Sequence, residues 1–178
     1  MEIRLARLPG TVHAGLDPGR LSGTSGRALS TVLDGIVIGK ETDKRNWATR
    51  TMIACLMPHE IRPTIPRASS YKLVVKSYNY LYEFGIWKDD CVYTAYWDPA
   101  NPVKSADPKL LTSTYRRGKK LLIVCGSYTG DITAKLTCKG QVRSAKNLET
   151  GEGLSVSGSE ITFPLKKHDF MLVEAELQ

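Results

Sequence analysis

The pattern of apolar residues changes at Asp90, and this change constrains the fold more than any other feature. From residue 91 to residue 178 apolar and polar residues alternate in short runs, as in strands that are buried on one face. Turn signals recur about every 8–12 residues, a spacing typical of an all-β sandwich or barrel. These turns fall at Arg117-Gly118, Thr129-Gly130, Thr150-Gly151, Gly158-Ser159 and Lys167-His168. We therefore expect a C-terminal antiparallel β-sandwich domain over 91–178, and expect residues 110–178 to form a compact sandwich that is stable without residues 1–90.

The chain before Asp90 predicts a different kind of structure. Residues 1–28 are rich in Gly, Pro, Ser and Arg and indicate an irregular segment. Residues 29–41 contain a nearly continuous apolar run, typical of a parallel strand that is buried on both faces. Such a strand needs neighbours on both sides, and the sequence supplies none. We therefore expect an exposed apolar edge around Leu33–Ile38 and self-association through it.

Two helices are expected between this strand and the sandwich. The first covers residues 43–57, with Asp43 as its N-cap and Pro58 as its end. The second covers residues 69–84, with a serine cap and with Gly85 just after its last turn. The predicted fold is thus mainly β: a C-terminal β-sandwich preceded, over residues 29–90, by a partial α/β segment of one strand and two helices.

Charge and cysteine content exclude several kinds of site. The net charge is +7, but the only dense basic group is Arg116, Arg117, Lys119 and Lys120 around Gly118. A solvated hairpin turn explains this group, and a phosphate-binding patch is the alternative. The four cysteines form no C-x-x-C pair, so we expect buried free thiols, no metal and no cofactor. No apolar run is long enough to span a membrane, and the chain begins without a signal-peptide pattern, which leaves the localisation open.

Several motifs resemble the C-terminal part of glycoside-hydrolase-like proteins that have a (β/α)8 barrel followed by a β-sandwich. The motifs are LDGIVIGKE as a late barrel strand, NYLYEFGIWKDD and TAYWDPANPV at the junction, KLLTSTYRRGKKLLIVCGSYTGDITAKL at the start of the sandwich, and AKNLETGEGLSV with ITFPLKKHDFMLVEAEL at its end. The resemblance implies that the chain is a fragment or a shortened relative, since most barrel strands are missing. It also implies a parent family that is often secreted.

The candidate site residues lie near the end of the predicted barrel strand. Sugar hydrolysis uses two carboxyl groups, and Asp34 and Glu41 are the candidates, although they form no matched catalytic pair. A structural buried acid at Asp34 and a solvated loop acid at Glu41 are the simpler interpretations. Aromatic rings stack on sugars, and Trp47 is the candidate for substrate binding. Trp87 and Trp97 are expected to pack the sandwich against the helix before it.

The sequence supports three functional hypotheses. The first is a sandwich module of a carbohydrate-active, glycoside-hydrolase-like protein, with a structural or weak glycan-binding role and no activity alone. The second is a basic β-module that binds nucleic acid or another acidic partner, a hypothesis that only the net charge supports. The third is a complete small enzyme, which the missing acid–base pair argues against. We expect carbohydrate as the partner, and expect neither a membrane nor, on balance, nucleic acid.

Overall fold

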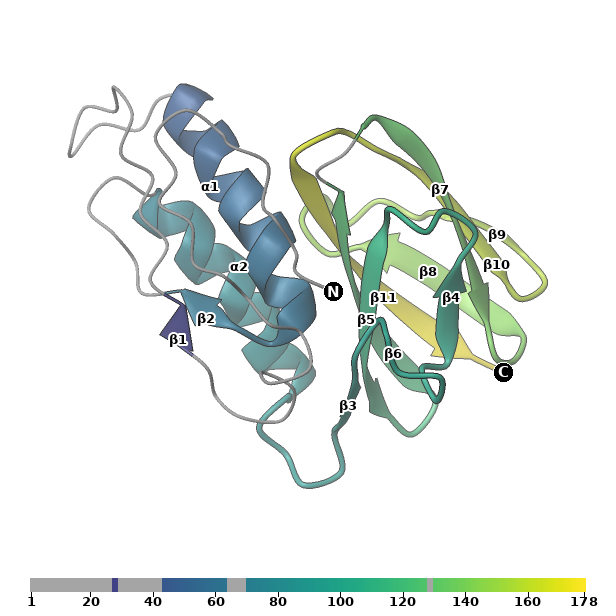
Figure 1. The fold of residues 1–178 in the computed structure, drawn as a ribbon. Coiled ribbons are helices and arrows are strands. Elements are labelled where there is room, and N and C mark those ends of the chain that lie inside the picture. The colour runs from purple at the N-terminus through teal and green to yellow at the C-terminus, as the bar shows by residue number, and fades with distance from the viewer. Residues whose placement is uncertain (1–26, 29–42, 64–69, 128–129) are drawn as a thin grey trace.

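The computed structural model describes residues 27–28, 43–63, 70–127 and 130–178, and it has three layers. Two helices form the first layer, a five-stranded sheet the second and a four-stranded sheet the third (Figure 1). All strand pairs within the two larger sheets are antiparallel. The predicted class, mainly β with a C-terminal sandwich after a helical segment, is confirmed.

The two helices form where the sequence predicts them. Helix α1 spans Asp43–Leu56 and continues into the 3-10 helix η1, Met57–His59. Helix α2 spans Tyr71–Phe84. The Ser70 hydroxyl accepts a hydrogen bond from the Leu73 amide at 3.4 Å, and Gly85 ends the helix with a φ of 90°. A serine cap and a glycine in the left-handed region are local signals, which explains why the sequence predicts this helix so well.

The β-sandwich is built from nine strands in two sheets. The five-stranded sheet has the order β3-β5-β6-β11-β8, and the four-stranded sheet has the order β4-β7-β10-β9. Three glycines of the predicted turns, Gly118, Gly151 and Gly158, have positive φ, as does His168. The strands are β3 Val92–Thr94, β4 Val103–Ser105, β5 Leu111–Arg117, β6 Lys120–Ser127, β7 Ile132–Cys138, β8 Val142–Asn147, β9 Ser155–Ser157, β10 Glu160–Leu165 and β11 Asp169–Leu177.

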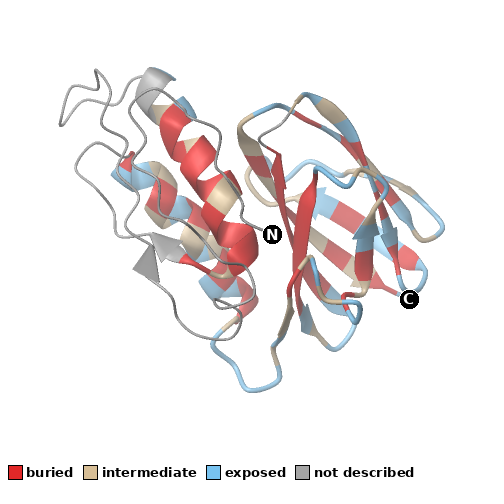
Figure 2. Cartoon of the chain, in the orientation of Figure 1, coloured by how far each residue is buried: buried red, intermediate tan, exposed pale blue. Residues whose placement is uncertain are grey.

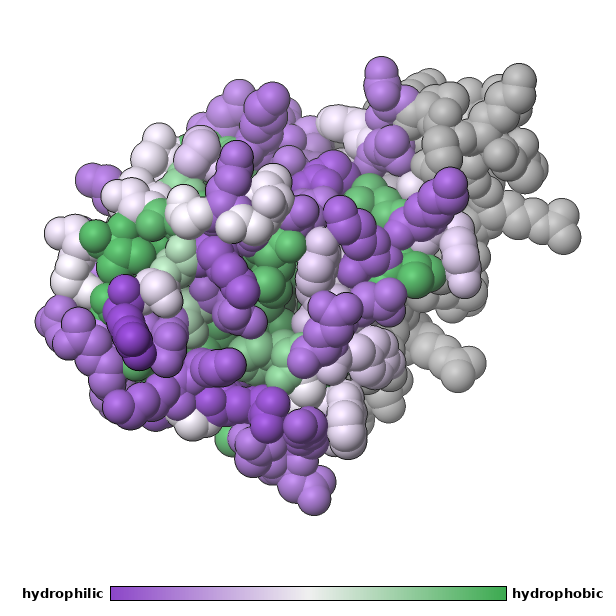
Figure 3. Space-filling model, turned by 180° about the vertical axis from the view of Figure 1, so that it is seen from behind, coloured by the Kyte–Doolittle hydropathy of each residue, from purple (hydrophilic) through white to green (hydrophobic). Residues whose placement is uncertain are grey.

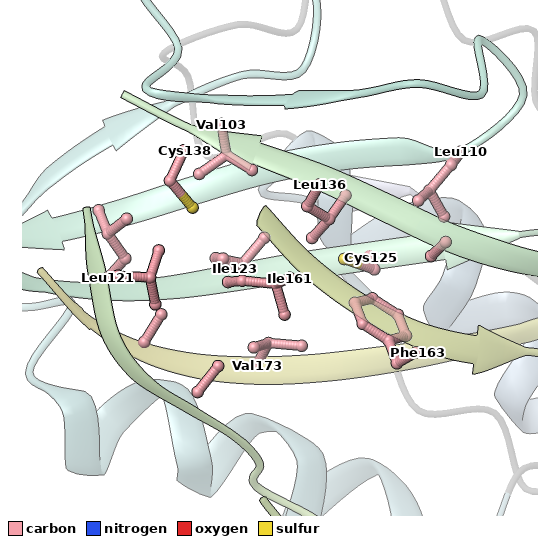
Figure 4. Close-up of a cluster of buried hydrophobic side chains, with 14 of the residues drawn as sticks. Val103, Leu110, Leu121, Ile123, Cys125, Leu136, Cys138, Ile161, Phe163 and Val173 are labelled. Atoms are coloured by element: carbon pink, nitrogen blue, oxygen red, sulfur yellow. The ribbon is translucent and has the colours of Figure 1, made fainter. Parts of the chain in front are cut away.

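One hydrophobic core lies between the two sheets (Figure 4). Ile123 and Val173 of the five-stranded sheet point toward Ile161 and Phe163 of the four-stranded sheet, and all four are fully or almost fully buried. From behind, the surface is mostly hydrophilic, with apolar side chains visible in separate areas between the polar ones (Figure 3). The alternation in the sequence therefore sorts residues between this core and solvent on the four-stranded sheet, as predicted.

A second core lies on the other face of the five-stranded sheet, under the helices. Leu122, Val124 and Leu172 of the sheet pack with Ile53 and Met57 of α1 and η1. Strand β6 is consequently buried on both faces from its second residue onward (Figure 2). The helical segment and the sandwich share this core. The predicted boundary near residue 91, and the stability of the sandwich without residues 1–90, stay predictions.

Some expectations fall outside the described residues or differ from them. The predicted barrel strand at 29–41, its apolar edge and the self-association expected from it lie outside the described residues and stay predictions. Two residues at the end of the segment expected to be irregular form a strand, β1 Arg27–Ala28. It pairs in parallel with β2, Arg62–Pro63.

Candidate functional site

Trp47 is the one predicted site residue that the structure describes. It lies early in α1, and its side chain remains 45% exposed. Its indole contacts the imidazole of His168 edge-on, with ring centroids 5.0 Å apart and planes at 65°. Asp34 and Glu41 lie outside the described residues, so their roles stay predictions. The site is therefore described from Trp47 outward.

His168 holds the indole from the turn between β10 and β11. Its φ of 61° is rare for a residue with a side chain, and the turn is fixed in part through Thr51 of α1. The Thr51 hydroxyl lies 3.0 Å from the Trp47 carbonyl oxygen and 3.4 Å from the His168 carbonyl oxygen. Burial and the nearby Lys167 charge lower the pKa of His168, which favours a neutral imidazole at pH 7.

A cluster of charged residues lies beside this aromatic pair and ties α1 to the sandwich. The Arg50 guanidinium donates two parallel hydrogen bonds to Glu149, at 2.9 and 2.8 Å, and a third to Asp169. The same guanidinium lies 4.5 Å from the centre of the Phe170 ring. Burial alone would lower the pKa of Arg50, but its hydrogen bonds and the two carboxylate charges more than offset this and raise it. Arg50 is therefore a permanent cation in a paired, partly buried position.

This cluster suits a structural role better than acid–base chemistry. Both carboxylates, Glu149 and Asp169, are bound to the same guanidinium, so neither stands free as a proton donor to a leaving group. The exposed part of the site is instead the Trp47 ring, which has the apolar face that stacking on a planar or ring-shaped ligand requires. Sequence reasoning missed the cluster because Arg50 is 99 residues from Glu149 and 119 from Asp169.

The other two tryptophans differ from each other. Trp97, after β3, is 37% exposed, and its ring packs near His59 of η1, with ring centroids 5.6 Å apart. Its neighbour Tyr96 contacts both rings edge-on. The expectation that Trp87 also packs against the helix is wrong, because its side chain is 67% exposed. It lies in the loop after Gly85, where the chain has already left α2.

His59 is the most deeply buried histidine of the described chain, at 4% exposure. Its Nδ1 is buried and has no hydrogen-bond partner among the described residues. Burial lowers its pKa, so the imidazole is neutral at pH 7. Tyr96 and Trp97 cover it from the segment after β3, which makes protonation of this ring unfavourable in the folded state.

The cysteines are free thiols, and no metal cluster is found in the described part of the chain. Cys125 and Cys138 are buried, whereas Cys55 and Cys91 are partly buried. Burial raises the pKa of Cys125 to about 12 and that of Cys138 to about 11, so both are protonated at pH 7. Within the described residues, no three His, Cys, Asp or Glu side chains are grouped so that they could hold a metal ion. No described helix has the length and apolar character needed to cross a membrane.

Comparisons with known proteins give weak structural neighbours. No protein-family model matches the chain, and no curated protein matches it. Three solved structures align with part of it, and each contains a glycoside hydrolase. The first, a GH27 β-L-arabinopyranosidase from Geobacillus stearothermophilus in complex with arabinose, has a TM-score of 0.35 and 13% identity, and the alignment covers 43% of this chain and 20% of the enzyme.

The other two cover more of this chain. A maltogenic α-amylase from Thermotoga neapolitana aligns with a TM-score of 0.41 and 11% identity, over 67% of this chain and 29% of the enzyme. An apo exo-carrageenase GH42 from Bacteroides ovatus aligns with a TM-score of 0.28 and 13% identity, over 67% of this chain and 15% of the enzyme. The chain thus spans less than a third of each enzyme. At these scores the likeness assigns no activity or ligand to it, and the chain is a mainly β protein whose weak structural neighbours are glycoside hydrolases.

Proposed function

We propose that this chain is a module of a carbohydrate-active, glycoside-hydrolase-like protein, with a structural and weakly glycan-binding role and no hydrolytic activity of its own. The sequence motifs quoted above for the barrel–sandwich junction and for the sandwich support this proposal. So does the arrangement of a β-sandwich behind two helices, which are the elements that the resemblance implies for residues 43–178.

The observation that carries the proposal is the exposed ring of Trp47. Tryptophan is highly buried on average, and an exposed indole that packing holds in one orientation offers a preformed apolar face. His168 supports one side of the ring, and Thr51 ties the helix backbone to the same turn. A sugar ring stacked on Trp47 would find the polar groups of the Arg50 cluster nearby. A single platform of this kind predicts low affinity, which fits a weak binding role.

Binding of the full chain to a panel of immobilised neutral glycans tests the proposal. We expect retention on at least one glycan, and we expect Trp47→Ala to abolish it. Trp97→Phe is the matched control. Because Trp97 lies with His59 at the junction, this substitution should leave retention unchanged. Retention that persists in Trp47→Ala would exclude this site. Turnover of an aryl glycoside by the purified chain would contradict the non-catalytic role.

A further inference from the structure

Arg117 joins two loops that are distant in sequence at one end of the molecule. Arg117, at the end of β5, donates a hydrogen bond to the Phe84 carbonyl oxygen at 2.9 Å, where α2 ends. It also binds Asp90 through two nitrogens, at 3.0 to 3.1 Å. These hydrogen bonds lower the pKa of Asp90 and keep it ionised at pH 7. The loop after α2 and the turn between β5 and β6 therefore form one continuous, pre-organised surface.

Apolar side chains are exposed in and beside the loop after α2. Among the described residues six large hydrophobic side chains are exposed, and three of them are Tyr82, Trp87 and Val92, with 42%, 67% and 60% exposure. All three lie within or directly beside the loop between α2 and β3, which is exposed along most of its length (Figure 2). Val92 pairs with Arg116 and lies on the sheet face away from Arg117, so the surface beside Arg117 carries the exposed indole of Trp87. Exposed aromatic side chains of this kind mark binding surfaces.

Exposed cations lie in the loop that carries Trp87 and in the turn that Arg117 joins to this loop. Lys88 lies with its ammonium 5.5 Å from the centre of the Trp87 ring. Arg116 pairs directly across the strands with Val92, so their side chains share one face of the sheet. Lys120 pairs in the same way with Arg117, and Lys119 is exposed at the turn between them. Arg116 and Arg117 are consecutive in β5, so Arg116 lies on the opposite face of the sheet from Arg117 and Lys120. Lys88, Lys119 and Lys120 are therefore the exposed cations beside the two loops that Arg117 joins.

We propose that the surface formed by Trp87, Lys88, Lys119 and Lys120 binds an acidic glycan, with a sugar ring stacked on Trp87 and its carboxylate or sulfate groups paired with the lysines. This inference rests on the proposed carbohydrate function and names a glycan class for it. It uses a surface separate from Trp47, since Trp47 contacts the turn before β11 and this surface is built on the turn between β5 and β6.

The distribution of charge favours a glycan over nucleic acid. Exposed Asp89 follows Lys88 in the chain, Glu176 pairs across the strands with Lys120, and Asp90 is bound by Arg117. DNA carries one negative charge for about every 1.7 Å of helix axis. Phosphates spaced so closely would lie beside these carboxylates as well as beside the lysines, and the repulsion disfavours binding. A polysaccharide with no more than one or two charges on each sugar can place its charges beside the cations and its ring on the indole.

Calorimetric titration of the full chain tests the inference with four probes: an oligogalacturonate, a heparin oligosaccharide, an uncharged maltooligosaccharide and a single-stranded DNA of matched charge. We expect one of the two acidic oligosaccharides to bind more tightly than the other probes, with an affinity that falls as salt rises. Trp87→Ala and the double variant Lys119→Ala/Lys120→Ala should each weaken this binding by about fivefold or more.

The matched control removes two other exposed lysines. Lys135→Ala/Lys139→Ala changes the net charge equally on the four-stranded sheet and just after it, and should leave binding within about twofold of the unmodified chain. Equal losses in the two lysine variants would overturn the inference, as would tighter binding of DNA or no binding of either acidic probe. If the inference is overturned, the proposed function still stands when a neutral glycan binds the full chain and the Trp87→Ala variant but not the Trp47→Ala variant.

Discussion

Gly126 of β6 lies directly against the backbone carbonyl of Ala54 in α1. A Cβ atom added to Gly126 would stand 2.2 Å from the Ala54 oxygen and 3.2 Å from Cγ of Pro58, so only glycine fits between the sheet and the helix. The two residues are 72 positions apart in the sequence. They lie on elements that the sequence assigns to different segments. This approach brings α1 close enough for its side chains to form the second core with the sheet.

Gly126→Ala should therefore destabilise the protein by about 3 kcal/mol or more, because a backbone group and not a flexible side chain blocks the new methyl group. Urea unfolding measures the change. Gly153→Ala is the matched control, since its Cβ would meet nothing within 4 Å, and it should stay within about 0.5 kcal/mol of the parent. Equal effects of the two substitutions would mean that α1 does not pack on β6 as described.

Arg50→Ala should cost about 1–3 kcal/mol of unfolding free energy, because it leaves Glu149 and Asp169 partly buried without their cation. Arg143→Ala removes an arginine whose 3.6 Å pair with Glu176 is largely exposed, and should cost less than about 1 kcal/mol. A double-mutant cycle of Arg50→Ala with Glu149→Gln should give a clear coupling energy. Additive effects in that cycle would contradict a direct interaction.

His59 should make stability fall as the solution becomes acidic. Its folded-state pKa is below the ordinary value of 6.5, so the unfolded chain takes up a proton first and stability is lost as pH falls below about 6.5. Each such group can contribute at most about 1.4 kcal/mol per pH unit. Since His168 acts in the same direction, the test compares the parent with His59→Phe between pH 7 and pH 5. Parallel stability profiles would show that His59 does not resist protonation.

Residues 88–178 expressed alone should be less stable than the full chain and should bind a hydrophobic dye. The sequence alone predicts that the sandwich is stable by itself, but removal of the helices uncovers apolar side chains on the five-stranded sheet. These are Tyr115, Leu122, Val124, Phe170 and Leu172. Thermal unfolding followed by circular dichroism measures the difference. A cooperative melt at the temperature of the full chain would support the original expectation.

Local sequence signals predict much of the fold, because each acts within a few residues. Ser70 and Gly85 mark the ends of α2 through hydrogen bonds to backbone groups no more than four residues away. Gly118 and Gly158 mark turns through their positive φ. These requirements do not depend on the rest of the chain, so the sequence pattern is sufficient to locate them.

Long-range packing explains what the sequence analysis did not predict. Asn101 lies between β3 and β4, and it is buried at 4% exposure. Its amide donates to the Ala95 and Thr112 carbonyl oxygens, and its oxygen accepts from Val103. In the same way, the partners of Arg50 are visible only in three dimensions. Asparagine and arginine are ordinary surface residues by composition, and only their contacts reveal these roles.

The central claim, glycan binding at Trp47, is tested most directly by NMR. The indole N–H signals of the three tryptophans are followed while a neutral oligosaccharide retained by the immobilised panel is added to the full chain. We expect the Trp47 signal to shift progressively and to saturate at millimolar ligand, while the Trp97 signal, from the ring packed near His59, does not move. An unchanged Trp47 signal at saturating ligand, or shifts confined to Trp97, would contradict glycan binding at Trp47.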